Sequence, residues 1–72
     1  MVEVGSTYRH FKGGVYQVIC IAKDSETLED MVFYENVENH KVWVRSYENF
    51  TSKVDLHKYP NEKQEYRFMK VK

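Results

Sequence analysis

The sequence has few of the residues that form disulfides or impose special backbone conformations. Its 72 residues include one cysteine, one proline and three glycines. The single cysteine, Cys20, excludes an internal disulfide and a zinc site built on cysteine ligands. Because Cys20 stands within an apolar run, we expect a buried, unreactive thiol. Acidic and basic residues number 11 each, which argues against indiscriminate binding to nucleic acid.

Long apolar runs are also missing. No stretch approaches the roughly 18 apolar residues of a membrane-spanning helix, and the first residues lack the apolar segment of a signal peptide. We therefore expect a cytoplasmic protein with no membrane partner. A chain of 72 residues has room for one domain, spanning residues 1–72. Such a chain buries only about 60% of the surface that it exposes when unfolded.

The clearest pattern is a pair of extended runs that meet at Gly13-Gly14, the only glycine pair. Glycine adopts a positive φ without steric cost, so this pair predicts a tight turn between strands at 7–12 and 15–23. Three further strands and one helical turn are expected, at residues 30–35, 40–45 and 51–56 and, for the turn, 46–50. Residues 66–71 alternate only weakly and could add an edge strand.

These elements predict an all-β fold. Five short strands, with a short helical turn before the last core strand, favour a small, SH3-like antiparallel barrel that is partly open. An oligonucleotide-binding barrel is the nearest alternative, but it usually needs longer strands and more residues. We expect the barrel core at about residues 5–56 and a loosely patterned tail at 57–72.

Several segments carry a family resemblance. Residues 8–18 have the pattern Tyr-Arg-His-Phe-Lys-Gly-Gly-x-Tyr-x-Val, and Trp-Val-Arg follows at 43–45 with Phe50 beyond it. This combination resembles domain-of-unknown-function family 1653, small bacterial and phage proteins that begin near YRHFKGGxYxV and later carry WVRPxxMF. The resemblance covers about residues 5–54, with Ser46 where the family often has proline. It implies a shared fold and no established activity.

The residues that usually carry catalysis or metal binding do not form a recognisable pattern. The three histidines, His10, His40 and His57, have no ligand spacing, and each lies within two residues of a lysine. The sequence has no Gly-x-Ser-x-Gly elbow and no phosphate-binding glycine loop. The acidic residues at 24–40 are typical of a solvated hairpin. We expect no enzymatic activity, no metal and no cofactor.

A binding role has more support, from the segment at 40–45. Strand alternation places Lys41, Trp43 and Arg45 on one face. If Val42 and Val44 fill the core, that face is exposed, and an aromatic plane between two cations can stack on a planar ligand. Arginine adds a planar fork for phosphate or carboxylate. The alternative is an inverted strand in which Trp43 is the main core anchor.

The cationic run before the glycine pair raises a similar choice. It is either an exposed strand with solubilising charges or, together with Arg45, one wall of a cationic pocket with an aromatic rim. The candidate ligand-binding residues are Arg9, His10, Arg45, Trp43, Tyr8 and Tyr34.

The leading hypothesis is therefore a non-catalytic binding module for an anionic or aromatic ligand, such as a nucleotide, a nucleic acid or a peptide. The alternative is a protein–protein interaction or homo-oligomerising module without a small ligand. The chain is then a monomer or a weak homo-oligomer, and its protein partner is unknown.

Overall fold

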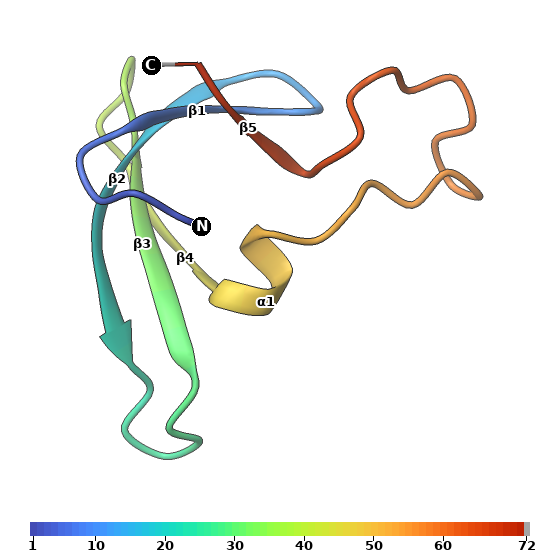
Figure 1. Cartoon of the computed structure of the whole chain (residues 1–72). Coiled ribbons are helices and arrows are strands. Elements are labelled where there is room, and N and C mark those ends of the chain that lie inside the picture. The colour runs from blue at the N-terminus through green and yellow to red at the C-terminus, as the bar shows by residue number, and fades with distance from the viewer. Residues whose placement is uncertain (72) are drawn as a thin grey trace.

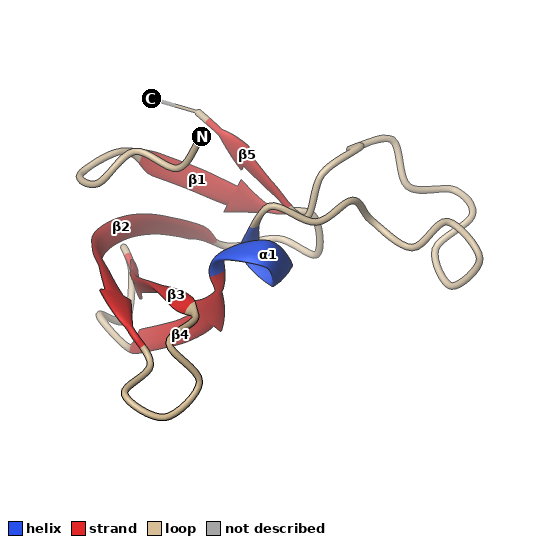
Figure 2. Cartoon of the chain, turned by 60° about the horizontal axis from the view of Figure 1, so that its bottom comes forward, coloured by secondary structure: helices blue, strands red, loops and turns tan. Residues whose placement is uncertain are grey.

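The computed structural model describes residues 1–71, and its five strands form one antiparallel sheet. The elements are β1 (Thr7–His10), β2 (Val15–Lys23), β3 (Asp30–Asn36), β4 (Val42–Ser46), α1 (Tyr47–Phe50) and β5 (Phe68–Lys70). The strand order is β4-β3-β2-β1-β5, so the last strand lies beside the first (Figure 1). The predicted fold of five antiparallel strands with one short helix is confirmed. The sheet is curled but not closed, and β4 and β5 are its edges (Figure 2).

The glycine pair forms the predicted hairpin between β1 and β2. Gly13 and Gly14 both have a positive φ, of 104° and 88°. The turn is closed by two backbone hydrogen bonds, from the N–H of His10 to Gly14 O and from the N–H of Gly13 to His10 O. Residues with side chains rarely adopt such φ values, so the turn depends on glycine at both positions.

The fifth strand is not where the sequence predicted it. The segment 51–56 belongs to a long loop that extends away from the sheet, and it pairs only through one bridge, between Lys53 and Tyr66 (Figure 1). The free edge of β1 accepts β5 instead, with His10 opposite Phe68. The strand prediction at 51–56 is therefore wrong, and the weak alternation at 66–71 is the sequence signal of β5.

The helical turn predicted at 46–50 is present as α1. Ser46 precedes it in an extended conformation, and its Oγ accepts a hydrogen bond from the N–H of Asn49 at 3.1 Å. A serine in this position satisfies a helix N–H that has no partner within the helix.

No helix within residues 1–71 has both the length and the apolar character needed to cross a membrane.

β2 changes the face that it presents to the core at a β-bulge around Ile19. Val18, before the bulge, is buried, and Ile21, after it, packs against the core. One extra residue shifts the alternation by one position. Cys20 therefore faces outward and is exposed, which makes the expectation of a buried thiol wrong.

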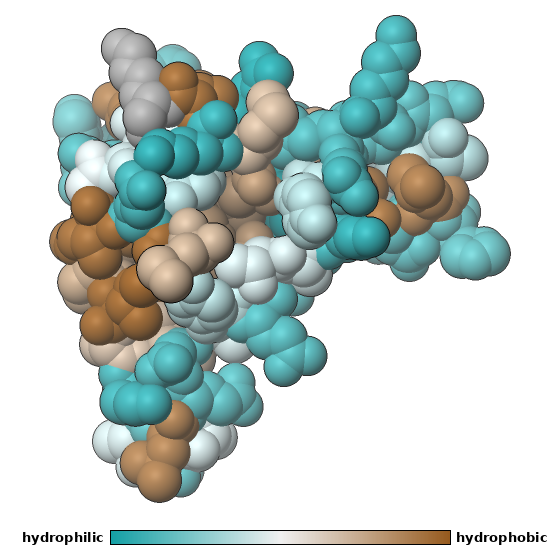
Figure 3. Space-filling view, in the orientation of Figure 1, coloured by the Kyte–Doolittle hydropathy of each residue, from teal (hydrophilic) through white to brown (hydrophobic). Residues whose placement is uncertain are grey.

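The core lies on the inner face of the curled sheet and is largely aromatic. Phe50 of α1 stacks on Phe68 of β5, with ring centroids 4.0 Å apart and an interplanar angle of 6°. Tyr34 of β3 meets both rings edge-on. Aromatic contacts of these two kinds stabilise a core beyond the area that they bury. Apolar residues gather over the sheet at the left of Figure 3, whereas the long loop at the right is mostly hydrophilic.

Candidate ligand-binding site

A pocket of about 190 Å³ opens on the inner face of the sheet, and every strand contributes to it. Its lining residues are His10, Tyr16, Tyr34, Trp43, Arg45 and Phe68. Four of them were candidate ligand-binding residues from the sequence alone. The sequence left open whether the cationic run meets Arg45, and in the structure the two line one pocket through His10.

The structure decides which face of β4 points inward. Val42 and Val44 do not fill the core, since they are 56% and 48% exposed. Trp43 pairs with Tyr34, whose side chain is buried, so Trp43 and Arg45 share the inner face. The strand is thus inverted relative to the interpretation with valines inside. Yet Trp43 is not a core anchor either, because its side chain lines the pocket and is 51% exposed.

Arg45 is held in place by neutral oxygen atoms. Its Nε donates to the hydroxyl of Tyr34 at 2.8 Å, and its Nη1 donates to Oδ1 of Asn49 at 2.6 Å. Its guanidinium also lies over the ring of Phe68, 5.8 Å from the centroid. Burial raises the pKa of Tyr34, although its hydrogen bond from Arg45 works in the opposite direction. Among residues 1–71, no carboxylate forms an ion pair with Arg45, so its positive charge is not neutralised.

His10 packs between two aromatic rings at the base of the hairpin. Its ring centroid is 4.8 Å from that of Phe11 and 4.8 Å from that of Phe68. The backbone N–H of Lys12 donates to Nδ1 of His10 at 3.1 Å. The other ring nitrogen, Nε2, is buried and has no hydrogen-bond partner among the described residues.

Burial and positive charge keep His10 neutral. Its pKa is lowered from 6.5 to about 4, mainly by burial and further by Arg45, Arg67 and Lys12. A neutral imidazole carries one proton, and Nδ1 acts as an acceptor here. The proton therefore resides on Nε2, which is a buried donor with no acceptor in the described part of the chain.

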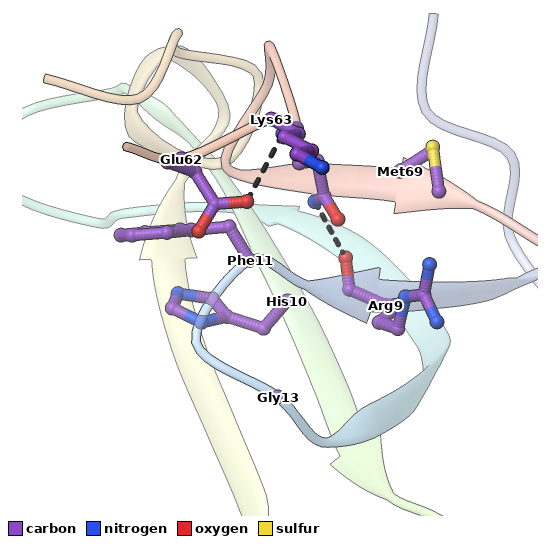
Figure 4. A pocket seen from close by; sticks show the side chains of 8 residues that line it. Arg9, His10, Phe11, Gly13, Glu62, Lys63 and Met69 are labelled. Atoms are coloured by element: carbon purple, nitrogen blue, oxygen red, sulfur yellow. Dashed lines mark hydrogen bonds between the residues drawn. The ribbon is translucent and has the colours of Figure 1, made fainter. Parts of the chain in front are cut away.

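The remaining candidates, Tyr8 and Arg9, do not line this pocket. Tyr8 is buried in the core, and its hydroxyl accepts a hydrogen bond from the N–H of Glu3 at 3.0 Å. Arg9 pairs with Met69 and lies on the opposite face of β1 from His10. Figure 4 shows the Arg9 side chain pointing away from His10, toward Met69.

Arg9 contributes to a larger groove of about 460 Å³ along β1 and the long loop, which His10 also lines (Figure 4). Gln64 bridges the two segments, since its Nε2 donates to the carbonyl oxygen of Arg9 at 3.1 Å. The groove has both an acidic and a basic side chain, Glu62 and Lys63, in its wall. It therefore lacks the single sign of charge that marks the smaller pocket.

Two lining residues, Tyr16 and Phe68, were not among the sequence candidates. Tyr16 pairs with Tyr8 across the hairpin, so strand alternation applied to both arms would have placed it on the face of His10. For Phe68 the sequence offered only the weak alternation at 66–71, which does not show that β5 pairs with β1, nearly sixty residues earlier in the chain.

Residues 6–70 match the model of a family described as a protein of unknown function (DUF1653). The chain belongs to the DUF1653 family. The match confirms the resemblance seen in the sequence motifs, and it runs through β5, so it includes every residue that lines the pocket. Comparisons with curated proteins and with solved structures gave no match. Within residues 1–71 of this DUF1653 protein, no three His, Cys, Asp or Glu side chains are grouped so that they could hold a metal ion.

Proposed function

We propose that this DUF1653 protein is a non-catalytic binding module, and that its pocket binds an anionic ligand with an aromatic group. The observation that carries the proposal is the environment of Arg45. Its guanidinium faces a cavity, has only neutral hydrogen-bond partners among the described residues, and lies beside the half-exposed ring of Trp43. A ligand oxyanion would supply the missing negative charge.

The sign of the charge separates this proposal from another use of aromatic pockets. Aromatic walls also suit quaternary ammonium groups, which bind to ring faces by cation–π attraction. Here the cations Arg45, Arg67 and Lys12 lie close enough to lower the pKa of His10. Their combined field would repel a cationic ligand and attract an anionic one.

We also propose that the curled sheet is a partly open SH3-like barrel. Its support comes from five short antiparallel strands, a single helical turn after β4, and a last strand that pairs with the first. In this arrangement α1 covers the open side of the sheet, since Phe50 fills the core between the edges (Figure 2).

The fluorescence of Trp43 tests the binding function directly, because it is the only tryptophan in the chain. Adenosine 5′-monophosphate (AMP) and benzoate are the anionic aromatic probes, and choline is the cationic one. We expect at least one anion to change the emission and choline to leave it unchanged. Arg45→Gln should weaken the binding of that anion about tenfold or more, as expected for the loss of a charged hydrogen-bond partner.

The matched control is Lys58→Gln, which makes the same change of charge at an exposed position of the long loop, outside the pocket lining. This variant should bind the anion as the unaltered protein does. A response to choline alone, or equal losses in the two variants, would show that Arg45 does not select the ligand.

The exposed valines of β4 favour a second candidate, a protein-interaction or homo-oligomerising module. Val42 and Val44 lie on the outer face of an edge strand, and edge strands offer unpaired backbone groups to other chains. Sedimentation velocity from 1 to about 500 μM tests the homo-oligomer. A sedimentation coefficient that increases with concentration, and no longer does so in Val44→Lys, would support it, and a strict monomer would exclude it.

A further inference from the structure

We infer that the pocket binds one nucleotide unit, with the base against Trp43 and a phosphate between the Nε2–H of His10 and the guanidinium of Arg45. This inference rests on the proposed function. It adds the class of ligand and the role of His10 in binding the phosphate. The unit can come from a free mononucleotide or from an unpaired nucleotide in a single strand.

The first support is the buried donor on His10. The hydrogen bond from Lys12 occupies Nδ1, so Nε2 carries the proton and lacks an acceptor among residues 1–71. A buried polar group without a partner is costly, and such groups are uncommon in folded proteins. Nε2 is closed to a water molecule, so a phosphate oxygen in the cavity that His10 lines would accept this hydrogen bond after a small rotation of the ring. An apolar or cationic ligand could not accept it.

The second support is the position of His10 relative to Arg45. The two side chains come from β1 and β4, and both contact the same ring, that of Phe68. Both also line the same cavity. Arg45 uses Nε and Nη1 for its described hydrogen bonds, which leaves Nη2 for a ligand. A neutral donor and a guanidinium at one site match a phosphate, which offers several acceptor oxygens and a negative charge.

The third support is the size and composition of the pocket. Its volume of about 190 Å³ lies below the roughly 300–1,000 Å³ of sites that enclose a whole drug-sized ligand. It therefore suits one unit of a larger molecule, or a small ligand with part of its surface outside. Trp43, with half of its surface exposed, offers a plane on which any base can stack. The tyrosines Tyr16 and Tyr34 line the rest of the cavity.

The experiment compares AMP with adenosine, which has the same base and sugar but no phosphate. Two signals are followed, the fluorescence of Trp43 and the imidazole nitrogens of His10 in long-range ¹H–¹⁵N spectra. AMP should change both signals, and adenosine should bind at least tenfold more weakly. The imidazole of His40, exposed beyond β3, serves as the internal control and should not respond to AMP at the concentrations that move His10.

Two substitutions of His10 separate hydrogen bonding from packing. His10→Phe keeps a ring beside Phe68 and removes the donor, whereas His10→Gln keeps an N–H donor and removes the ring. We expect His10→Phe to lower the affinity for AMP about tenfold without changing the affinity for adenosine. His10→Gln should retain more of the AMP affinity than His10→Phe does. Both variants are first shown to be folded by the dispersion of their amide signals.

A single-stranded tetrathymidylate without terminal phosphates identifies the source of the nucleotide. Tighter binding of the tetramer than of AMP, with an affinity that decreases steeply with salt, indicates a nucleic-acid strand. Tighter binding of AMP indicates a free nucleotide. Equal binding of AMP and adenosine with an unchanged His10 signal would overturn the phosphate site.

Failure of the inference can be told apart from failure of the proposed function. If benzoate changes the Trp43 emission and neither AMP nor the tetramer does, the inference of a nucleotide ligand is wrong. The proposal of an anionic aromatic ligand is then still supported. If none of these anions affects Trp43, both are wrong.

Discussion

The guanidinium of Arg45 on β4 lies 5.8 Å from the ring centroid of Phe68 on β5, although these two strands are the opposite edges of the sheet. The contact is made because the open sheet curls until its edges face each other. The pocket lies between them and takes residues from every strand. Its shape therefore depends on β5, a strand of only three residues, remaining paired with β1.

Replacement of Phe68 should affect the fold and the pocket together. Phe68 is buried and stacks on Phe50 at 4.0 Å, so Phe68→Ala removes a large ring from the centre of the core. We expect the free energy of unfolding to fall by about 3–5 kcal/mol, measured by urea denaturation. The neighbouring Met69→Ala, on the outer face of β5, should change it by only about 0.5 kcal/mol. Similar losses in the two variants would show that β5 does not anchor the core.

The sequence predicted those parts of the fold that depend on local signals. The glycine pair indicated the first hairpin because its backbone requirement is met by adjacent residues, and the helical turn at 46–50 also lies within consecutive residues. The position of β5 could not be predicted in this way. It depends on a pairing between Phe68 and His10, and the segment at 51–56 had a stronger local pattern.

The site was predicted in part, for a related reason. Whether His10 and Arg45 converge was left open, and Arg9 was included because the sequence does not show which residues of a charged run face inward. The β-bulge around Ile19 explains the error at Cys20, since one unpaired residue reverses the alternation and leaves no clear mark in the sequence. In β4, the sequence left open which face points inward, because both valines and Trp43 are apolar, and the structure places the valines outward.

The two glycines of the hairpin should differ in their sensitivity to alanine. A Cβ at Gly14 would lie 3.1 Å from side-chain atoms of Tyr16, whereas a Cβ at Gly13 would meet no atom of residues 1–71 within 4 Å. Both have a positive φ, so each substitution should cost about 1–3 kcal/mol of stability through backbone strain. Gly14→Ala should cost more stability, and it should also weaken ligand binding by displacing Tyr16 from the pocket wall.

Thermal denaturation measures the loss of stability, and a ligand titration followed by Trp43 fluorescence measures the loss of affinity. Gly13→Ala is the matched control, and an equal loss of ligand affinity in both variants would contradict the contact with Tyr16.

His10 should make the stability of the fold sensitive to mild acid. Its pKa is about 4 in the folded protein and near 6.5 when it is free of its surroundings. Above about pH 6.5 the residue is neutral in both states and contributes no pH dependence. Between pH 6.5 and 4 the unfolded chain binds a proton that the folded chain does not bind. The free energy of unfolding should therefore decrease as the pH falls through this range, and the decrease should level off below about pH 4.

Urea denaturation at several pH values between 4 and 7.5 measures this dependence. His10→Gln has no titrating group at this position, so the difference in stability between the two proteins should change across the interval and be constant above it. A constant difference from pH 4 to 7.5 would mean that His10 titrates alike in both states. Addition of a bound phosphate ligand should raise the pKa of His10, because a neighbouring anion favours the charged imidazole.

The last prediction concerns how Arg45 is positioned. Asn49 accepts a hydrogen bond from Arg45 at 2.6 Å through its side chain, while its backbone N–H is bound separately by Ser46. Asn49→Ala should therefore remove the contact with Arg45 and keep the helical turn. We expect a loss of about 1 kcal/mol in stability and a several-fold weaker affinity for the anionic ligand, because the guanidinium is less well fixed.

Glu48→Ala, at the exposed position beside it in the same turn, is the control. It removes a negative charge, so electrostatics alone would leave anion binding unchanged or slightly stronger. Tyr34→Phe removes the hydroxyl that accepts the other hydrogen bond from Arg45, at 2.8 Å. It should lower the affinity for the anionic ligand, as Asn49→Ala does. Both partners hold one guanidinium, so the double variant should lose less affinity than the two single losses combined. Strict additivity would show that they affect the ligand by separate routes and not through Arg45.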